Sequence, residues 1–374
     1  MNMTYTIDGV DLENERLLVH KTDLITLIQQ STYVDATFYL LSGRYPSAQE
    51  KIEFNKALLQ LSRSIFSLIK KNNCLKNIAR LSIPYEQKMI AGITVIDQSD
   101  LKQCAAEVSA IFPMIKNQLD LSVGLAVFAL SKMLVGFFQN KNYLNETEDK
   151  IKKSENYIDI VSIVFMRKEK ISISEKINLD KLLIALYAGF GITTPSIILP
   201  RFSASTQAPM LLNLIAGFTG SGPAHVGACR NMMLLLIDLN PLSSDAAIHK
   251  LEELINSGNK VPGFGHPLFY KDPRNDILYE FASGQLPQNS FLELYHLISE
   301  FMWSKYQLYP NVDAIAAAIL LALGVNPELG SVLFLWARMP AMIAHSIEKK
   351  SKPAFGFKRS EARERFERFP VDWI

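Results

Sequence analysis

Apolar residues recur at three- and four-residue spacing through most of this chain, and no other feature constrains its fold as strongly. This spacing places the apolar side chains on one face of a helix. It is clearest in five segments: Leu24–Gln30, Ile52–Lys70, Leu101–Lys116, Leu182–Ala188 and Ala208–Ala216. Strand-like alternation is scarce, and no regular succession of strands and helices is visible. The sequence therefore predicts an all-α protein.

The chain has 374 residues, which is enough for a large core and a second, smaller lobe. No Gly/Ser-rich or Pro-rich linker divides it, and no repeat of fixed period is present. A second lobe must therefore be an excursion from the main domain. The longest apolar stretch, Leu121–Phe138, is interrupted by Lys132 and is just short of a membrane span. We expect a buried helix there and no association with a membrane.

Charge and cysteine content limit the partners and the compartment. The 39 Lys and Arg residues nearly balance the 37 Asp and Glu residues, so nucleic acid is not an expected partner. Three cysteines form no Cys-x-x-Cys or Cys/His cluster, so we expect no metal site, and their odd number suits a reducing compartment. The polar, acidic start of the chain is unlike a signal peptide. We expect a cytoplasmic protein, and a mitochondrial matrix location stays open.

Glycine and proline concentrate at three places, each of which also carries ionisable residues. The first is Gly220–Gly227, where a sharp turn brings His225 to the edge of the next helix. A phosphate-binding loop is excluded because no Gly-Lys-Ser/Thr follows. His225 is therefore either a hydrogen-bonded loop histidine or a catalytic one.

The second place runs from Val261 to Arg274 and contains four glycines and prolines before a helix start at Asp272-Pro273. We expect these residues to form a tight loop with exposed amides, which suits a nucleotide or a thioester. An N-cap followed by a first-turn proline explains Asp272 and Pro273. It does not explain His266, which lies between a glycine and a proline, or Arg274.

The third place is Pro310-Asn-Val-Asp313, which leads into an apolar helix as far as Gly324. A carboxylate in the first turn of a helix is stabilised by the helix dipole, so Asp313 can be a cap. A buried helix is also a costly place for a charge without a partner or a task. Both interpretations of Asp313 stay open on this evidence.

Taken in this order, the three clusters resemble the citrate synthase family. Members of that family carry a Gly-Pro-Leu-His turn, a Pro-Gly-Phe-Gly-His…Asp-Pro-Arg loop and a Pro-Asn-Val-Asp segment. The resemblance extends over nearly the whole chain. Its further matches are Tyr39–Pro46, Thr194–Ser196, Ala204–Thr206 and the series Arg338, Ala344-His345, Glu348, Lys352-Pro353.

The resemblance implies an all-α fold in which a small domain closes over the substrates held by a large one. Mapped here, the large domain comprises residues 1–227 and 325–374, and the small domain comprises residues 228–324. The family's functional unit is a homodimer, in which an arginine of one subunit reaches the active site of the other. In this sequence Lys352 takes that position.

The resemblance also implies a reaction, in which an acyl-CoA (acetyl- or propionyl-CoA) forms an enolate that condenses with a 2-oxo acid. Asp313 is then the base, His225 the neutral donor to the enolate oxygen, and His266 the group that polarises the ketone. The acceptor's carboxylates would be held by Arg274 and Arg338, and by Lys352 of the partner subunit. CoA, a co-substrate rather than a tightly bound cofactor, would lie over the loop Val261, Pro262, Gly263, Phe264, Gly265. Cleavage of citryl-CoA and a non-catalytic paralogue that binds CoA or a carboxylic acid are the alternatives.

This sequence departs from the family pattern where the acceptor should bind. The family carries a further histidine before its paired Ser/Thr segment, and that histidine holds oxaloacetate. The equivalent stretch here is Ala188–Ser196, and no histidine occurs between His20 and His225. Lys352 replaces a bidentate arginine with a point charge, and Ala224 and Val226 alter the first motif. The identity of the acceptor therefore stays open.

Overall fold

The computed structural model describes residues 7–109, 111–112, 118–140, 142–168, 170–191, 193–220, 222, 225–352 and 360. Within these residues the fold is almost entirely helical, which confirms the predicted all-α class. The altered Ala224, the Pro353 that completes one matched motif, and residues 113–116 of one predicted helix lie outside the described residues.

The first half of the described chain forms nine α-helices. They are α1 (Leu24–Gln30), α2 (Tyr33–Ser42), α3 (Ala48–Lys71), α4 (Asn73–Arg80), α5 (Tyr85–Thr94), α6 (Gln98–Ser109), α7 (Leu119–Gln139), α8 (Tyr143–Lys153) and α9 (Tyr157–Met166). The second half adds α10 (Ile173–Tyr187), α11 (Pro195–Ser205), α12 (Met210–Thr219), α13 (Gly227–Leu239), α14 (Ser244–Asn256), α15 (Pro273–Gln285), α16 (Ser290–Tyr306), α17 (Val312–Ala322), the 3-10 helix η2 (Pro327–Leu329) and α18 (Gly330–Lys350). Each of the five predicted helical segments coincides with a helix, but the described residues of the segment predicted over 101–116 are helical only to Ser109, and the one predicted over 208–216 begins at Met210.

Local sequence explains where many of these helices begin and end. Helix α2 ends at Gly43, whose φ of +75° is the left-handed conformation that glycine adopts without strain. Helix α3 begins after Ser47, which forms a capping box with Glu50. The predicted stop at Gly43 is confirmed, and the next helix begins two residues after Pro46.

A small antiparallel sheet near the amino terminus was not predicted. Its strands are β1 (Asp8–Asp11), β2 (Arg16–Val19) and β3 (Thr22–Asp23), in the order β1-β2-β3. The register pairs Asp8 with Val19. The strands are too short for an alternating pattern to stand out in the sequence, because β1 and β2 have four residues each.

The core is built around α7 and α18, which pack against each other. Helix α7 is the one described helix that is long and apolar enough to cross a membrane, and 94% of its most apolar window is buried inside the fold. Trp336 of α18 stacks on Phe128 of α7, with ring centroids 4.7 Å apart. This packing confirms the predicted buried helix over residues 121–138.

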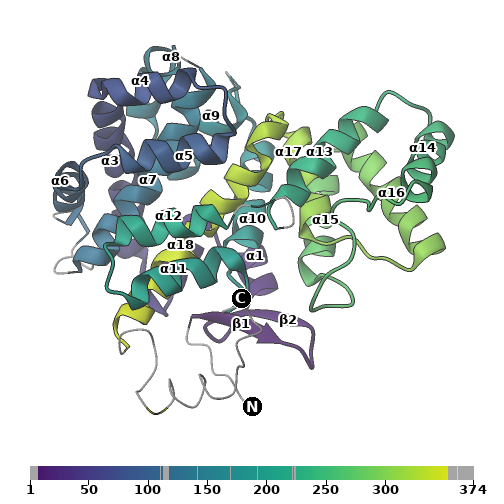
Figure 1. Cartoon of the computed structure of the whole chain (residues 1–374), viewed down its shortest axis with the longest axis horizontal. Coiled ribbons are helices and arrows are strands. Elements are labelled where there is room, and N and C mark those ends of the chain that lie inside the picture. The colour runs from purple at the N-terminus through teal and green to yellow at the C-terminus, as the bar shows by residue number, and fades with distance from the viewer. Residues whose placement is uncertain are drawn as a thin grey trace.

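Figure 1 shows that α14, α15 and α16 lie to one side of the molecule, away from α3 to α9. Helices α13 and α17 pack against each other at the junction between the two parts. They lie at the two ends of the segment 228–324, for which we predict a separate small domain. The amino-terminal ends of α13, α15 and α17 carry the three motif clusters, and the middle of α18 lies beside them.

Candidate active site

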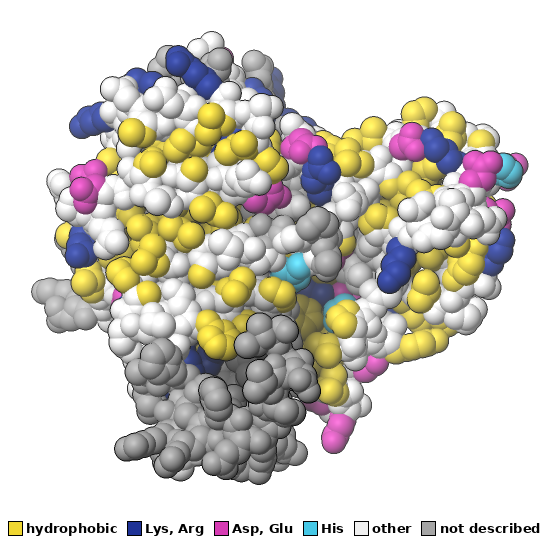
Figure 2. Space-filling model, viewed as in Figure 1, with side chains coloured by type: hydrophobic (Ala, Val, Ile, Leu, Met, Phe, Trp, Pro, Cys, Tyr) yellow, Lys and Arg dark blue, Asp and Glu magenta, His cyan; other side chains and the backbone are white. Residues whose placement is uncertain are grey.

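A cavity of about 480 Å³ lies at this junction, and five of the predicted site residues line it. They are His225, His266, Arg274, Asp313 and Arg338. These residues come from four separate elements and are up to 113 positions apart in the sequence (338 − 225). In Figure 2 the cyan histidine surface is visible in the hollow between the two parts of the molecule. The structure therefore gathers in one place what the sequence presents as three separate motifs.

Asp313 is a partly buried residue with one carboxylate oxygen, Oδ1, that is fully buried and has no hydrogen-bond partner. It lies in the first turn of α17, but the cap of that helix is Asn311, whose side chain accepts a hydrogen bond from the Asp313 amide at 2.9 Å. The N-cap is therefore Asn311, and Asp313 keeps only the first-turn position that the helix dipole favours. Its Oδ1 atom is buried and unpaired. Burial raises the pKa of Asp313 to about 7, against the lowering effect of Arg274. A carboxyl group with this pKa can exchange a proton near neutral pH.

The loop before His266 is held against the segment that leads into α17. Gly263 and Gly265 both have φ of +79°, and a side chain at Gly263 would lie 2.7 Å from the Ala314 nitrogen. Gly263 O accepts from the Asn311 amide at 2.8 Å, and the Gly265 amide donates to Tyr309 O at 2.9 Å. The expectation of a tight loop is confirmed, but the Gly265 amide is not exposed. The two glycines allow this loop to lie close to the backbone of the segment that leads into α17.

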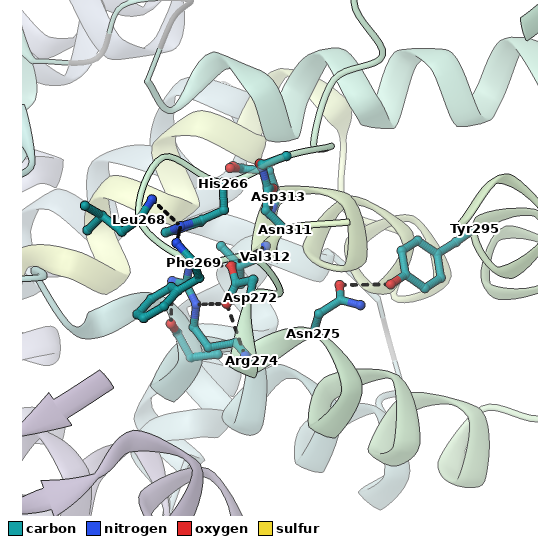
Figure 3. A network of polar contacts seen from close by, with 12 residues as sticks. His266, Leu268, Phe269, Asp272, Arg274, Asn275, Tyr295, Asn311, Val312 and Asp313 are labelled. Atoms are coloured by element: carbon teal, nitrogen blue, oxygen red, sulfur yellow. Dashed lines mark hydrogen bonds and ion pairs between the residues drawn. The ribbon is translucent and has the colours of Figure 1, made fainter. Parts of the chain in front are cut away.

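His266 is a neutral hydrogen-bond donor to the cavity. Its Nδ1 accepts hydrogen bonds from the amides of Leu268 and Phe269, both at 3.1 Å (Figure 3). A ring nitrogen that accepts cannot carry the proton, so the proton of the neutral ring lies on Nε2. Burial lowers the pKa of His266, and Asp272 only partly opposes it. The Nε2 hydrogen is therefore available to a ligand at neutral pH.

His225 is also held neutral. It lies two residues before α13, as predicted, and its Nε2 is 3.3 Å from Ser196 Oγ. Burial and, to a smaller extent, the nearby charge of Arg338 lower the pKa of His225 to about 4. When Ser196 donates its hydroxyl proton to Nε2, Nδ1 carries the hydrogen of the neutral ring. The two histidines of the cavity are thus donors rather than cations.

The two arginines of the cavity differ in how many of their N–H groups are already engaged. Arg274 donates from Nε and Nη2 to Asp272, at 2.9 and 2.7 Å. Asp272 is the N-cap of α15 and precedes Pro273 at the first helical position, which confirms the predicted helix start. Arg338 donates from Nε to Leu186 O at 2.7 Å, and its buried Nη1 has no partner. Arg338 is the less committed of the two guanidinium groups.

Two other predicted elements lie outside the cavity lining. Of the described residues, those that line it do not include Val261–Gly265. Lys352 follows the end of α18, where its half-exposed side chain donates to Glu348 Oε1 at 3.2 Å. Among the same described residues, no group of three or more His, Cys, Asp or Glu side chains is placed to hold a metal ion.

Two site residues escaped the sequence analysis. Phe190 lines the cavity, and its ring stacks on His266 with centroids 5.7 Å apart. Asp8 is buried and accepts hydrogen bonds at 2.6 Å from the amides of Gly189 and Gly191, on either side of Phe190. The sequence signal was a phenylalanine between two glycines. No local pattern connects this stretch to Asp8, which lies 181 residues before Gly189.

The sequence matches a known family over most of its length. Residues 2–356 match the family model described as citrate synthase, C-terminal domain. The chain is 24% identical to the citrate synthase of Corynebacterium glutamicum over 359 residues, which cover 87% of this chain and 75% of that protein. It is 25% identical to the citrate/2-methylcitrate synthase of Bacillus subtilis over 354 residues, which cover 92% and 89%.

Solved structures share the fold. A citrate synthase from Thermoplasma acidophilum, in a ternary complex with carboxymethyl coenzyme A and oxaloacetate, superposes with a TM-score of 0.73 at 17% identity and covers 96% of this chain and 92% of that chain. The citryl-CoA lyase of Hydrogenobacter thermophilus superposes with a TM-score of 0.52 at 23% identity, covering 57% of this chain and 84% of its own.

Proposed function

Because this chain belongs to the citrate synthase family, we propose that it condenses an acyl-CoA thioester with a 2-oxo acid and releases CoA. One observation carries the proposal: Asp313, a carboxylate with one buried and unpaired oxygen, lies in the same cavity as two neutral histidines. This is the set of groups that enolate chemistry needs, since a weak carbon acid requires both a base and a donor at the developing oxyanion.

In the first step Asp313 takes a proton from the α-carbon of the thioester. The electrons of that C–H bond move to the thioester oxygen, and the neutral imidazole of His225 donates a hydrogen bond to it. A neutral donor serves better than a cation here, because it does not hold the base in a permanent ion pair. The pKa of Asp313, about 7, keeps a useful fraction of the base ionised at neutral pH.

In the second step the enolate carbon attacks the ketone carbon of the 2-oxo acid. His266 donates its Nε2 hydrogen to the ketone oxygen and stabilises the alkoxide as the carbon–carbon bond forms. Arg338, with its unpaired Nη1, binds the acceptor's carboxylate. Water then cleaves the thioester of the adduct, which gives a second carboxylate and the free CoA thiol. The acyl group is acetyl or propionyl.

Cleavage of a citryl-CoA-type thioester is the second candidate. The likeness of the fold to the citryl-CoA lyase of Hydrogenobacter thermophilus favours it. The same groups serve both directions, because the base that removes the α-proton in synthesis returns it in cleavage.

Two assays separate these functions: release of the free CoA thiol reports the condensation, and formation of a 2-oxo acid from citryl-CoA reports the cleavage. The purified protein is mixed with acetyl- or propionyl-CoA and a set of 2-oxo acids, and citryl-CoA is tested separately for cleavage. We expect thiol release with at least one pair. Cleavage of citryl-CoA without any synthesis would favour the lyase. Binding of CoA without either reaction would leave a non-catalytic paralogue.

Replacing Asp313 tests the base directly. We expect Asp313→Asn to lower turnover by about 10²- to 10⁴-fold, the range for a positioned general base, with CoA affinity nearly unchanged. Asp245→Asn is the matched control, because Asp245 lies in the first turn of α14 but is exposed. Equal turnover in the Asp313→Asn variant and the control would remove Asp313 from the mechanism.

We also propose that the protein acts as a homodimer. Hydrophobic side chains gather on the face over α5, α11 and α12 (Figure 2). Phe202 of α11 is 65% exposed and Leu212 of α12 is 46% exposed, although both are large apolar residues. Sedimentation equilibrium tests this, and a monomer at micromolar concentration would contradict it.

A further inference from the structure

Phe190 places an aromatic ring in the part of the cavity that should bind the acceptor. The ring stacks on His266 and lies 4.7 Å from the Arg274 Cζ and 5.9 Å from the Arg338 Cζ, measured from the ring centroid. It is therefore in contact with the ketone-polarising histidine and close to both cationic groups. An acceptor held by these groups must lie against an apolar surface on one side.

The position of this ring is built into the fold. Phe190 has φ of +60°, which is uncommon for a bulky residue and requires support from its surroundings. Asp8 supplies the support, since its two oxygens accept the amides of Gly189 and Gly191 at 2.6 Å each. His345 Nε2 lies 3.1 Å from the same carboxylate. Burial alone would raise the pKa of Asp8, but His345 and the two amides lower it overall, so the carboxylate stays ionised.

The hydrogen-bonding capacity of the cavity favours one carboxylate rather than two. Arg274 uses Nε and Nη2 on Asp272, and its Nη1 is 3.4 Å from Ala185 O. Arg338 keeps a buried Nη1 without a partner. Arg274 and Arg338 are the only Lys or Arg side chains among the described residues of the lining, and Asp313 adds a carboxylate there. Within one chain, a second acceptor carboxylate would meet the Phe190 ring instead of a free guanidinium fork.

We propose that the acceptor is a 2-oxo monocarboxylate with an apolar group beyond the ketone, such as a short alkyl chain. This inference rests on the proposed condensation. The carboxylate binds Arg338, the ketone oxygen accepts from His266 Nε2, and the alkyl group packs on Phe190. Attack by the enolate forms the new carbon–carbon bond, the ketone becomes a tertiary hydroxyl group, and hydrolysis of the thioester releases CoA. Phe190 is thus the residue that determines acceptor specificity.

Matched pairs of acceptors test the proposal. Oxaloacetate and 2-oxobutanoate both have four carbons and differ in a distal carboxylate or methyl group. 2-Oxoglutarate and 2-oxopentanoate form a second pair with five carbons. With acetyl- or propionyl-CoA, we expect kcat/KM to be at least about tenfold higher for the apolar member of each pair, since a buried carboxylate without a partner binds poorly. Equal or higher kcat/KM for the dicarboxylates would overturn the proposal.

Two substitutions test whether Phe190 sets the preference. Phe190→His offers a ring of similar shape with a hydrogen-bond donor, and we expect it to shift the kcat/KM ratio toward oxaloacetate by about tenfold. Phe190→Leu keeps the surface apolar, so we expect it to retain the wild-type preference at reduced affinity. An equal shift in both variants, or none in Phe190→His, would show that the ring does not determine specificity.

Direct binding keeps this inference separate from the proposed reaction. Calorimetric titration of 2-oxobutanoate and oxaloacetate into the unmodified protein, without acyl-CoA, measures acceptor affinity whether or not turnover occurs. Tighter binding of 2-oxobutanoate with no thiol release would reject the condensation and support the assigned acceptor class. Thiol release together with tighter binding of oxaloacetate would support the condensation and reject the acceptor class.

Discussion

Two neighbouring aspartates, Asp272 beside the cavity and Asp313 in its lining, show how the same side chain acquires different properties. Asp272, the cap of α15, accepts two hydrogen bonds from the Arg274 side chain and one from the Val312 amide at 2.9 Å (Figure 3). Asp313 lies next to Val312 in the chain, yet its Oδ1 has no partner. Burial raises the pKa of both groups. Arg274 reverses the effect for Asp272, whose pKa is lowered, whereas the pKa of Asp313 is raised to about 7.

The difference is one of partners rather than of burial. A buried charge must be compensated, and Asp272 has its compensation at a fixed position in the same loop. Arg274, Arg338 and the Cys229 amide only partly offset the desolvation of Asp313, so its ionised form is destabilised and it is prepared to accept a proton. Asp272 therefore stabilises the architecture of the site, and Asp313 is available for chemistry. The following predictions test this division.

The largest expected effect on stability follows from replacing Asp272, whose charge is compensated by Arg274. Asp272→Asn leaves the Arg274 guanidinium buried without a counter-charge, and we expect the free energy of unfolding to fall by about 3–5 kcal/mol. Denaturant titration measures it. Asp276→Asn is the control, because its ion pair with Lys271 is exposed and its loss should change stability by less than about 0.5 kcal/mol. Similar losses in the two variants would show that Arg274 gains nothing from Asp272.

Asp313, whose charge is less fully compensated, should show the opposite effect: its replacement should raise the free energy of unfolding. Between pH 3.8 and about 7 the unfolded chain ionises at Asp313 while the folded protein keeps the proton there, so stability falls as pH rises through this window. Asp313→Asn removes that loss. We expect the variant to be about 4 kcal/mol more stable than the wild type at pH 8, and nearly equal to it near pH 4. Thermal unfolding at both pH values measures the difference, and a variant less stable at pH 8 would contradict it.

The pH dependence of turnover should report the same group. The base acts only when ionised, so kcat falls about tenfold for each pH unit below the Asp313 pKa of about 7. His225, with its pKa lowered to about 4, stays neutral over this range and does not bend the profile. Thiol release between pH 5 and 8 measures it. A flat profile over this range would assign the base to a carboxylate with an unshifted pKa.

The sequence predicted the helical class and the residues around the proposed base, Asp313, because their signals are local. Helix spacing, the Asp272-Pro273 start and the order of the three clusters all lie within short windows. The partner relations did not follow from such windows. Asp313 was open between a cap and a base because the cap, Asn311, is recognised only by the direction of its side chain.

The part of the cavity around Phe190, where the acceptor is proposed to bind, was harder to predict. It depends on contacts between distant segments. Phe190 belongs to a stretch in which the sequence showed only a missing histidine. Its role depends on Asp8 of strand β1 and on His345 of α18, which are far apart in the chain. No periodic pattern links these residues, so three-dimensional coordinates were needed to find them.

The smallest expected effect concerns the ion pair between Lys352 and Glu348, which is open to water, unlike the buried pair of Asp272 and Arg274. Lys352 donates to Glu348 at 3.2 Å, but its side chain is half-exposed and the pair spans one helical turn. We expect Lys352→Ala to change the free energy of unfolding by less than about 0.5 kcal/mol, about a tenth of the effect at Asp272. If Lys352 also binds the acceptor in the partner subunit, as the family resemblance implies, the same variant raises the acceptor KM without lowering stability. Measuring the free energy of unfolding and the acceptor KM on one variant separates the two roles. An unchanged KM would limit Lys352 to its ion pair at the end of α18. There water stabilises the charges, whereas the buried charge of Asp272 is stabilised by Arg274.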